Sequence, residues 1–199
     1  MKANEINILI ACECSGKIRD EFIRLGFNAV SCDLKPSETD GPHIQGDVLE
    51  VIEQGWHAMI AHPECRYLCF SGERWMTERP ERLKDRQQAF EFFKKLAGAK
   101  IQYKAIENSH SIFLNREYKK PTQTIHPYHF GDPFKKATCL WLSGFPPLIP
   151  TNILPIGHRH PAAWLEAPGA NRSENRARTY QGIATAIAKQ WGEFLIKNL

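Results

Sequence analysis

The stretch "EINILIACECSGKIRDEFIRLGFNAVSCDL", residues 5–34, decides the fold. Its first seven residues are mostly apolar and β-branched, which predicts a buried strand. The following "KIRDEFIRLGF" places apolar side chains at helical spacing and stops at Gly26. The segment "NAVSCDL" predicts a second strand that ends in Asp33. A strand, a helix and a strand in this order predict a crossover unit with parallel strands.

The same alternation continues along the chain. We expect further strands at 44–48, 56–61, 100–108 and 138–144, helices at 49–54 and 82–98, a C-terminal helix within 175–199, an irregular charged segment at 71–86 and loop at 145–171. This pattern predicts one α/β domain over residues 1–199, with its core in 1–142. The sheet should be mostly parallel and twisted, with helices on both faces.

Composition sets the broad class of protein. Apolar residues make up 42% of the 199 residues and charged residues 24%, which is typical of a soluble domain. No apolar run approaches the roughly 20 residues of a membrane span, and the N-terminal sequence does not resemble a signal peptide. We therefore expect a cytoplasmic protein that does not enter a membrane.

Charge and cysteine content narrow the class of partner. The net charge of +4 leans mildly towards polyanionic partners. The six cysteines lie mostly in or beside apolar runs, as reduced thiols do, and their spacing does not complete a tetrahedral zinc site. We expect no bound metal.

Polar residues follow the predicted strands at the point where each strand ends. These groups are Cys12–Gly16, Asp33, Asp47, His62–Cys65 and Glu107 with Asn108. Parallel sheets bind ligands at the carboxyl ends of their strands, so the groups should converge on one edge. An acidic residue such as Asp33 can bind ribose hydroxyls there, although a role in a turn or helix cap is equally common for Asp33 and Asp47.

Cys65 has two interpretations. A single cysteine is usually an inert buried thiol. However, Glu107 should end the strand beside it, and a carboxylic acid opposite a thiol suits covalent attack on a pyrimidine ring. Glu64 complicates this, because its negative charge would disfavour a thiolate if it pointed at the sulfur.

At these residues the chain resembles the cytosine-5 DNA methyltransferases, particularly their very short phage and prophage relatives. The family pattern D-L-F-A-G-x-G-G-F-R-x-A-L-x-x-A-G-F is similar to "ILIACECSGKIRDEFIRLGF", with matches at Gly16, Arg19, Gly26 and Phe27. The Pro-Cys motif of the family resembles residues 62–65, and its Glu-Asn-Val motif resembles residues 107–109. The closing helix motif is similar to "YQGIATAIA".

This resemblance implies a Rossmann-like methyltransferase fold and S-adenosylmethionine-dependent methylation of cytosine in DNA. It implies a cofactor across Glu13, Gly16, Asp33 and Asp47, catalysis by Cys65, Glu107 and Glu64, and base contacts from His62, Pro63, Asn108 and Gln123. Cys65 would attack carbon 6 of the base. No separate target-recognition domain is expected, because residues 145–171 are too few for extensive major-groove reading.

Two alternatives remain open at the level of the sequence. One is a base-pocket enzyme with changed chemistry, such as a DNA glycosylase, which the extra carboxylates of Glu13 and Glu64 would suit. The other is a non-catalytic protein that binds a nucleotide or DNA in phage–host conflict. The oligomeric state is left open by the sequence.

Overall fold

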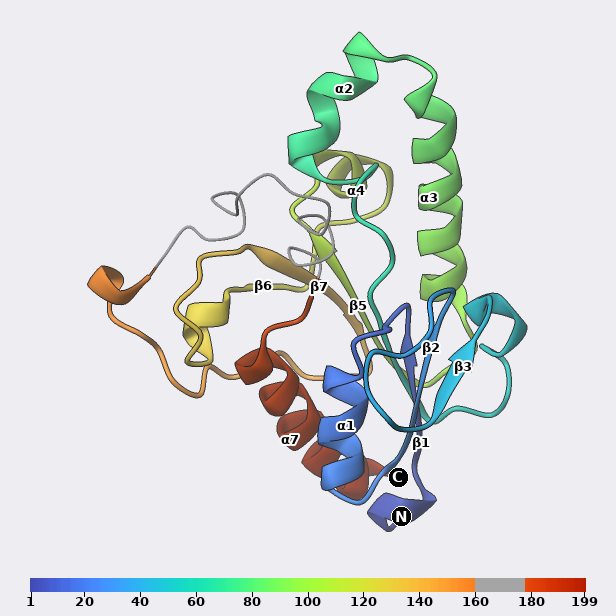
Figure 1. Ribbon diagram of the computed structural model, residues 1–199, viewed down its shortest axis with the longest axis vertical. Coiled ribbons are helices and arrows are strands. Elements are labelled where there is room, and N and C mark those ends of the chain that lie inside the picture. Colours follow the sequence, from blue (N-terminus) through green and yellow to red (C-terminus); the bar gives the residue numbers. More distant parts are fainter. Residues whose placement is uncertain (160–177) are drawn as a thin grey trace.

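The computed structural model describes residues 1–159 and 178–199. In this part of the chain a seven-stranded sheet forms the centre of the molecule, in the order β3-β2-β1-β4-β5-β7-β6 (Figure 1). The strands are β1 (Asn7–Ala11), β2 (Asn28–Asp33), β3 (His43–Gln45), β4 (Ala58–Ala61), β5 (Tyr103–Ser109), β6 (Gln123–Ile125) and β7 (Thr138–Ser143).

The first five strands run parallel to their neighbours. β7 runs antiparallel to both β5 and β6. The order β3-β2-β1-β4-β5 is that of a doubly wound Rossmann sheet, in which ligands bind beyond the carboxyl ends of the strands. The prediction of a mostly parallel sheet is confirmed.

Helices cover both faces of this sheet, as predicted (Figure 1). They are α1 (Lys17–Arg24), α2 (Glu73–Glu78), α3 (Arg82–Gly98), α4 (Ile112–Glu117) and α7 (Gln181–Asn198). On one face, α1 and α7 pack Phe22 and Trp191 against Ile8 and Ile10 of β1. On the other face, α3 packs Phe93 against the sheet beside Leu9 of β1 and Met59 of β4.

The alternation along β1 explains this two-sided core. Ile8 and Ile10 face α1 and α7, whereas Leu9 and Ala11 face α3. All four side chains are fully buried, and burying a large aliphatic side chain contributes about 1.5–3 kcal/mol. A strand that is apolar on both faces is therefore expected in the middle of a parallel sheet.

The prediction of an irregular segment over 71–86 is wrong. Residues 70–72 form the 3-10 helix η3 (Phe70–Gly72), and α2 follows it directly. Tertiary contacts stabilise α2, because Met76 is buried and Glu73 forms an ion pair with Arg86 of α3 at 3.1 Å. α4 and β6 also lie where no element is predicted.

Several connections are 3-10 turns. They are η1 (Ala3–Glu5), η2 (Val48–Glu50), η4 (Pro127–His129) and η5 (Ile156–His158), and η2 replaces the short helix predicted at 49–54. Part of the predicted loop at 145–171 and the start of the predicted C-terminal helix lie outside the described residues. Within the described residues, no helix has both the length and the apolar character that crossing a membrane requires.

Candidate active site

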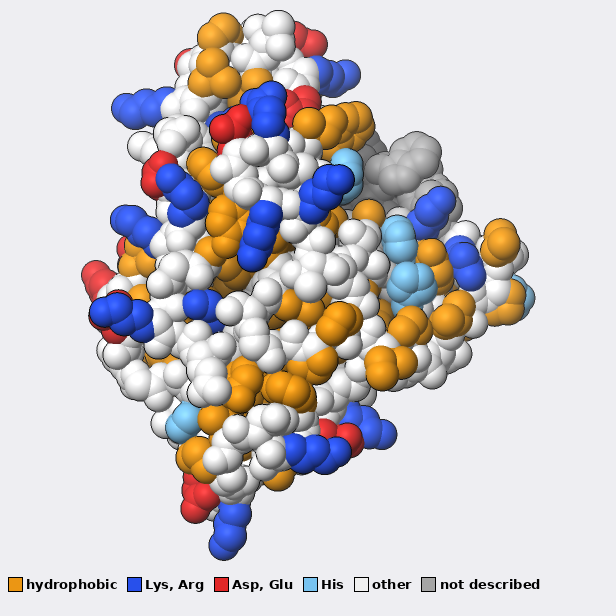
Figure 2. Space-filling model, turned by 180° about the vertical axis from the view of Figure 1, so that it is seen from behind, with side chains coloured by type: hydrophobic (Ala, Val, Ile, Leu, Met, Phe, Trp, Pro, Cys, Tyr) orange, Lys and Arg blue, Asp and Glu red, His pale blue; other side chains and the backbone are white. Residues whose placement is uncertain are grey.

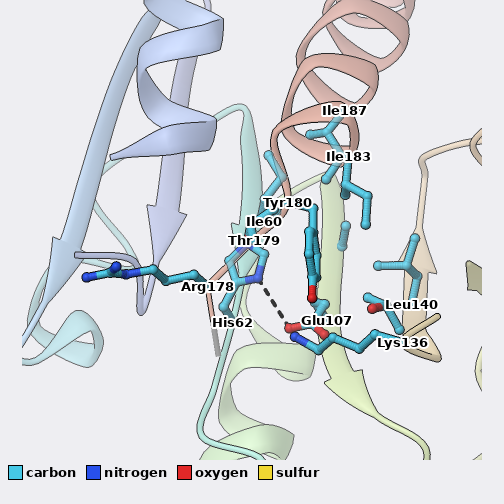
Figure 3. Close-up of a pocket in the computed structure, with 12 residues that line it drawn as sticks. Ile60, His62, Glu107, Lys136, Leu140, Arg178, Thr179, Tyr180, Ile183 and Ile187 are labelled. Carbon is cyan, nitrogen blue, oxygen red and sulfur yellow. Dashed lines mark hydrogen bonds and ion pairs between the residues drawn. The ribbon is translucent and has the colours of Figure 1, made fainter. Parts of the chain in front are cut away.

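A pocket lies at the carboxyl ends of β4 and β5, beside the start of α7 (Figure 3). Its apolar lining comes from Ile60, Ala105, Leu140, Ile183 and Ile187, and its polar lining from His62, Glu107, Lys136, Thr138, Arg178, Thr179 and Tyr180. The volume is about 20 Å³, which is room for about one water molecule. The pocket therefore has polar groups at its mouth and an apolar floor, but it is narrow in this state.

Glu107 and His62 form the central polar pair of this pocket. His62 Nδ1 lies 3.4 Å from Glu107 Oε2. Burial by itself would raise the pKa of Glu107, but the His62 hydrogen bond and the charge of Lys136 outweigh burial and hold the pKa below its usual value. Glu107 is therefore an ionised hydrogen-bond acceptor at neutral pH. His62 Nε2 is buried and has no hydrogen-bond partner among the described residues.

Cys65 lies in the turn that follows β4, and it is not among the described residues that line the pocket. Burial raises the pKa of its thiol, and the negative charge of Glu107 adds to this effect. A hydrogen bond with the Ser109 side chain and the charge of Lys136 act in the opposite direction, but the net shift is upward. Cys65 is therefore a thiol at neutral pH, placed within electrostatic reach of an ionised carboxylate.

Asn108 holds the His62–Cys65 turn against β5. Its Nδ2 donates to the Pro63 carbonyl at 3.2 Å, and its Oδ1 accepts from Ser109 N at 3.0 Å. Asn108 is fully buried, and Pro63 is buried as well. Both residues therefore position the turn that carries His62 and Cys65.

Glu64 does not share the surroundings of Cys65. Its carboxylate is 58% exposed and pairs with Arg66, whose Nε lies 3.1 Å from Glu64 Oε1. The charged groups that shift the Cys65 pKa are Glu107, Cys69 and Lys136. Glu64 therefore lies in a surface ion pair, and its catalytic role stays a prediction.

Gln123 is also engaged elsewhere. Its Nε2 donates to the Leu148 carbonyl at 2.7 Å, and its Oε1 accepts from Leu148 N at 2.8 Å. Both ends of the amide join β6 to the segment after β7. Gln123 therefore has a structural contact in place of the expected base contact.

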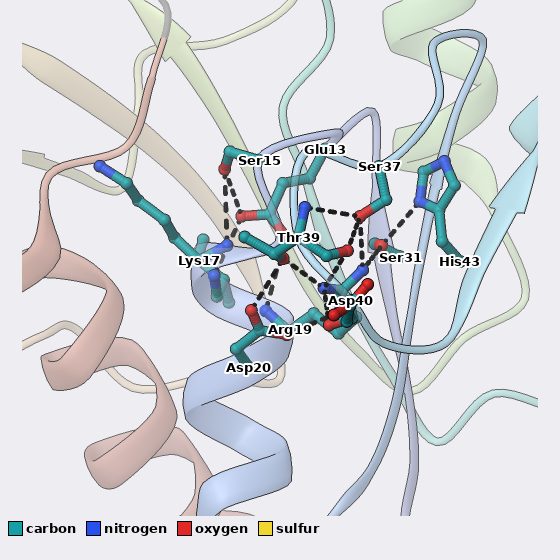
Figure 4. Close-up of polar contacts among 11 residues, drawn as sticks. Glu13, Ser15, Lys17, Arg19, Asp20, Ser31, Ser37, Thr39, Asp40 and His43 are labelled. Atoms are coloured by element: carbon teal, nitrogen blue, oxygen red, sulfur yellow. Dashed lines mark hydrogen bonds and ion pairs between the residues drawn. The ribbon is translucent and has the colours of Figure 1, made fainter.

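Glu13 caps the first helix (Figure 4). It is buried, and its carboxylate accepts from Ile18 N at 3.0 Å, from Arg19 N at 3.4 Å and from the Ser15 hydroxyl at 3.2 Å. These amides are the ones that bind anions at the start of a helix. The carboxylate of Glu13 is therefore engaged within the protein, and its contact with a cofactor stays a prediction.

Arg19 forms hydrogen bonds that hold the β2–β3 loop beside the loop that follows β1. Its side chain is fully buried, and its guanidinium donates to Ser31, Ser37, Thr39 and Asp40 at 2.7–3.1 Å and pairs with Asp20 at 2.8 Å (Figure 4). A buried arginine requires this many partners, because an unpaired buried charge is strongly unfavourable.

Gly16 is required by this arrangement. Its φ of 72° is in the left-handed region, and it is the residue that precedes α1. A Cβ at this position would collide with Thr39 Oγ1 and with the Arg19 guanidinium. Gly16 therefore shapes the loop and leaves room for the β2–β3 loop.

Asp33 ends β2, whereas Asp47 lies two residues beyond the end of β3 and caps η2. Asp33 Oδ1 accepts from Lys35 N at 2.9 Å, and Asp47 Oδ1 accepts from Leu49 N at 2.9 Å, so both side chains shape local turns. Burial raises the pKa of Cys12, and the charges of Asp33, Cys32 and Asp47 raise it further. The space around Cys12 is therefore electronegative.

Arg178 connects this electronegative region with the pocket. It lines the pocket, and its NH2 group lies 2.9 Å from Glu38 Oε1 in the β2–β3 loop. Glu38 N in turn donates to the Cys14 carbonyl at 2.8 Å. Arg178 and Glu38 therefore connect the pocket to the loop that follows β1.

Lys136, Tyr180 and Arg178 are pocket residues that the site prediction omits. Lys136 belongs to a Lys-Lys pair just before a predicted strand, and Tyr180 begins the "YQGIATAIA" motif. Both positions can be located in the sequence, but a lysine pair before a strand is more commonly solvated surface charge. In the described part of the chain, no three His, Cys, Asp or Glu side chains are grouped so that they could hold a metal ion.

Comparison with known proteins supports the fold. No family model matches the chain, and no curated protein matches it in sequence. The structure is similar to that of the Entamoeba histolytica methyltransferase EhMeth, with a TM-score of 0.50 and 14% identity. The match covers 75% of this chain and 57% of EhMeth, so the chain spans little more than half of that protein. The chain thus has a methyltransferase-like, Rossmann-like fold.

Proposed function

We propose that the protein modifies bases in nucleic acid, most directly by S-adenosylmethionine-dependent methyl transfer to cytosine in DNA. The observation that carries this proposal is that Cys65 follows β4 within electrostatic reach of ionised Glu107 of the neighbouring β5, at the carboxyl ends of these strands in a methyltransferase-like sheet. A thiol and a carboxylate at one edge are the groups that covalent activation of a pyrimidine requires.

The charge of the first loop fits S-adenosylmethionine. This cofactor carries a sulfonium, an ammonium and a ribose, and Asp33 and Asp47 make the space around Cys12 electronegative. An acidic side chain at the end of the second strand suits ribose hydroxyls. Glu13 already occupies the amides at the start of α1, which disfavours a phosphate-bearing cofactor there. When bound, S-adenosylmethionine supplies the methyl group.

Glu107 and His62 would hold the base. An ionised carboxylate accepts a hydrogen bond from the exocyclic amine of cytosine, which uracil and thymine lack. His62 Nε2 offers a second polar atom that lacks a partner among the described residues. Ile60 and Leu140 supply the apolar surface on which a flat ring can lie.

Cys65 would activate the ring. The thiol loses its proton to water, and its sulfur forms a bond to carbon 6 of cytosine. The electron pair of the double bond between carbons 5 and 6 moves to carbon 5, which then takes the methyl group. The methyl group would come from the sulfonium of S-adenosylmethionine, which would leave as a neutral thioether. Transfer of the carbon 5 proton to water then restores the double bond and breaks the carbon–sulfur bond. Lys136 and Ser109 stabilise the thiolate that begins and ends this sequence.

A base enters only when the pocket widens. Its volume of about 20 Å³ is far smaller than a cytosine. The residues just before α7, Arg178 to Tyr180, form one wall, and Arg178 is held by Glu38. Movement of this wall would admit the base. The Arg178–Glu38 contact links that movement to the β2–β3 loop.

Trapping of Cys65 tests the proposal. An oligonucleotide that contains 5-fluorocytosine cannot lose its carbon 5 substituent, so a covalent adduct should persist when S-adenosylmethionine is present. The wild-type protein and Cys69→Ser should give the adduct, whereas Cys65→Ser should not. An adduct in Cys65→Ser would refute the role of Cys65. Calorimetry that detects no binding of S-adenosylmethionine would exclude methyl transfer.

A non-catalytic DNA-binding or nucleotide-binding role is the second candidate. The raised pKa of the Cys65 thiol favours it, because a methyltransferase of this type needs the thiolate. This candidate predicts DNA binding without any adduct. A glycosylase loses its support, since Glu13 caps α1 and Glu64 lies in a surface ion pair.

A further inference from the structure

A group of aromatic and cationic side chains surrounds η4, outside the pocket. We call His126, Tyr128, His129, Lys135 and Arg159 the η4 cluster. The rings of His126 and Tyr128 stack with centroids 5.0 Å apart and planes 13° apart, and His129 meets Tyr128 edge-on at 4.5 Å. The Arg159 guanidinium lies 3.9 Å from the centre of the Tyr128 ring. On the face shown in Figure 2, histidine side chains gather beside lysine and arginine side chains.

Hydrogen bonds join members of the cluster to one another and to the surrounding backbone. Arg159 Nε donates to the Leu154 carbonyl at 2.8 Å, and Leu154 N donates back to the Tyr128 carbonyl at 2.9 Å. His126 N donates to His129 Nδ1 at 3.2 Å. Both imidazoles and Arg159 are half-buried, whereas Lys135 is exposed. The side chains of the cluster therefore lie together where they reach solvent.

The charged groups that act on the two imidazoles are all cationic. Burial lowers the pKa of His126, and His129, Lys135 and Arg159 lower it further, against a hydrogen bond with the backbone of Lys136. Burial and then Arg159 lower the pKa of His129. The carboxylate of this segment, Asp132, is turned to the start of α7, where its Oδ2 accepts from Gly182 N at 2.8 Å. An anion placed here would offset the positive charges of Lys135 and Arg159 and favour protonation of both imidazoles.

The same segment joins the cluster to the pocket. Lys135 acts on His126, and the next residue, Lys136, lines the pocket. The ring of Phe134 packs on the ring of Tyr180, which also lines the pocket, with centroids 5.0 Å apart. A nucleic-acid strand with one base in the pocket would therefore pass close to the η4 cluster.

We propose that the η4 cluster binds backbone phosphate of the nucleic-acid strand, and that it does so more strongly as His126 and His129 take up protons. This proposal rests on the proposed action on nucleic acid, but not on methyl transfer. Lys135 and Arg159 supply permanent positive charge, and the imidazoles add charge that depends on pH. Such contacts position a strand without reading its sequence.

Binding of oligo-dT tests this proposal by fluorescence anisotropy across a range of salt concentrations. Oligo-dT contains no cytosine, so this assay and the trapping of Cys65 fail independently. Each lost phosphate contact reduces the slope of log affinity against log salt by about 0.7 for a single strand. We expect that reduction for Lys135→Gln and for Arg159→Gln. Lys189→Gln, which removes an exposed lysine of α7, is the matched control and should keep the wild-type slope.

The imidazoles are tested by pH. Because burial and neighbouring cations lower the pKa of both imidazoles, wild-type affinity should rise several-fold as the pH falls from about 7 to about 5. The variant with His126→Asn and His129→Asn should lose most of that rise. Thermal melting checks that each variant is folded. Unchanged salt slopes in folded Lys135→Gln and Arg159→Gln would overturn the proposal. So would displacement of oligo-dT by inorganic phosphate at an equal concentration of phosphate groups, since that would identify a site for free phosphate.

Discussion

His62 and Glu107 come from the ends of two neighbouring parallel strands, and their side chains meet with Nδ1 and Oε2 3.4 Å apart. The contact helps to keep a buried carboxylate ionised where burial alone would favour its protonation. It also sets the electrostatic surroundings of Cys65, because the charge on Glu107 raises the thiol pKa. One polar pair thus influences both the charge at the edge of the pocket and the pKa of the Cys65 thiol.

Removal of the Glu107 charge should make Cys65 more reactive. In Glu107→Gln the negative charge that raises the thiol pKa is lost, so alkylation of Cys65 by iodoacetamide should become faster at neutral pH. Lys136→Met should have the opposite effect, and Lys189→Met serves as its control. Mass spectrometry of the Cys65 peptide over a pH series measures both rates. Identical pH profiles in all three variants would contradict this account of the thiol.

Glu107 should also make the free energy of unfolding depend on pH in the acidic range. Its pKa is lower in the folded protein than in the unfolded chain, where it is about 4.3. The stabilisation is therefore fully present above that value and is lost as the pH falls through the folded-state pKa. Urea unfolding at about pH 7 and about pH 3 should show a smaller advantage of wild type over Glu107→Gln at the lower pH. The exposed Glu78→Gln should give no such difference.

Gly16→Ala should destabilise the protein by roughly 1–3 kcal/mol, because it combines a left-handed φ with a steric clash. The new Cβ would press on Thr39 and Arg19 and loosen the β2–β3 loop. Gly98→Ala at the end of α3 is the contrasting change, since nothing lies within 4 Å of its added Cβ. It should leave stability unchanged or raise it by up to about 1 kcal/mol. Equal losses in the two variants would disprove this explanation.

Arg19→Met should reduce the free energy of unfolding by roughly 2–4 kcal/mol, since several buried acceptors lose their donor at once. Arg24→Met removes an exposed arginine of the same helix and should change it by less than about 0.5 kcal/mol. Chemical unfolding measures both. The β2–β3 loop of Arg19→Met should also be cleaved faster by a protease, and cleavage at the wild-type rate would argue against the fastening role of Arg19.

The elements with strong periodicity were predictable from sequence. The helix predicted at 82–98 has the same bounds as α3, because Phe90, Phe93 and Leu96 face the sheet and Gly98 ends it. The edge at which the functional groups meet follows from the parallel strands alone. α2 was not predictable in this way, because its six residues depend on the burial of Met76 and on the Arg86 contact, which are tertiary effects.

Side-chain direction limits the prediction of the site. Residue order places Glu64 beside Cys65, but the pairing of Glu64 with Arg66 is a property of the folded turn. Gln123 lies on β6, yet both ends of its amide bind Leu148, which is 25 residues away in the chain. The sequence places Glu13 just after the first strand, but only the structure shows its carboxylate accepting a hydrogen bond at the start of α1.

The reversed direction of β7 has a consequence for how this protein can change. The parallel strands reach the ligand edge with their carboxyl ends, but β7 reaches it with its beginning, so the segment before β7 is delivered there as well. That segment carries Lys136 and four members of the η4 cluster between two strands of the outer part of the sheet. Replacement of residues 126–136 would therefore change the lining at this edge of the pocket without changing any of the five parallel strands.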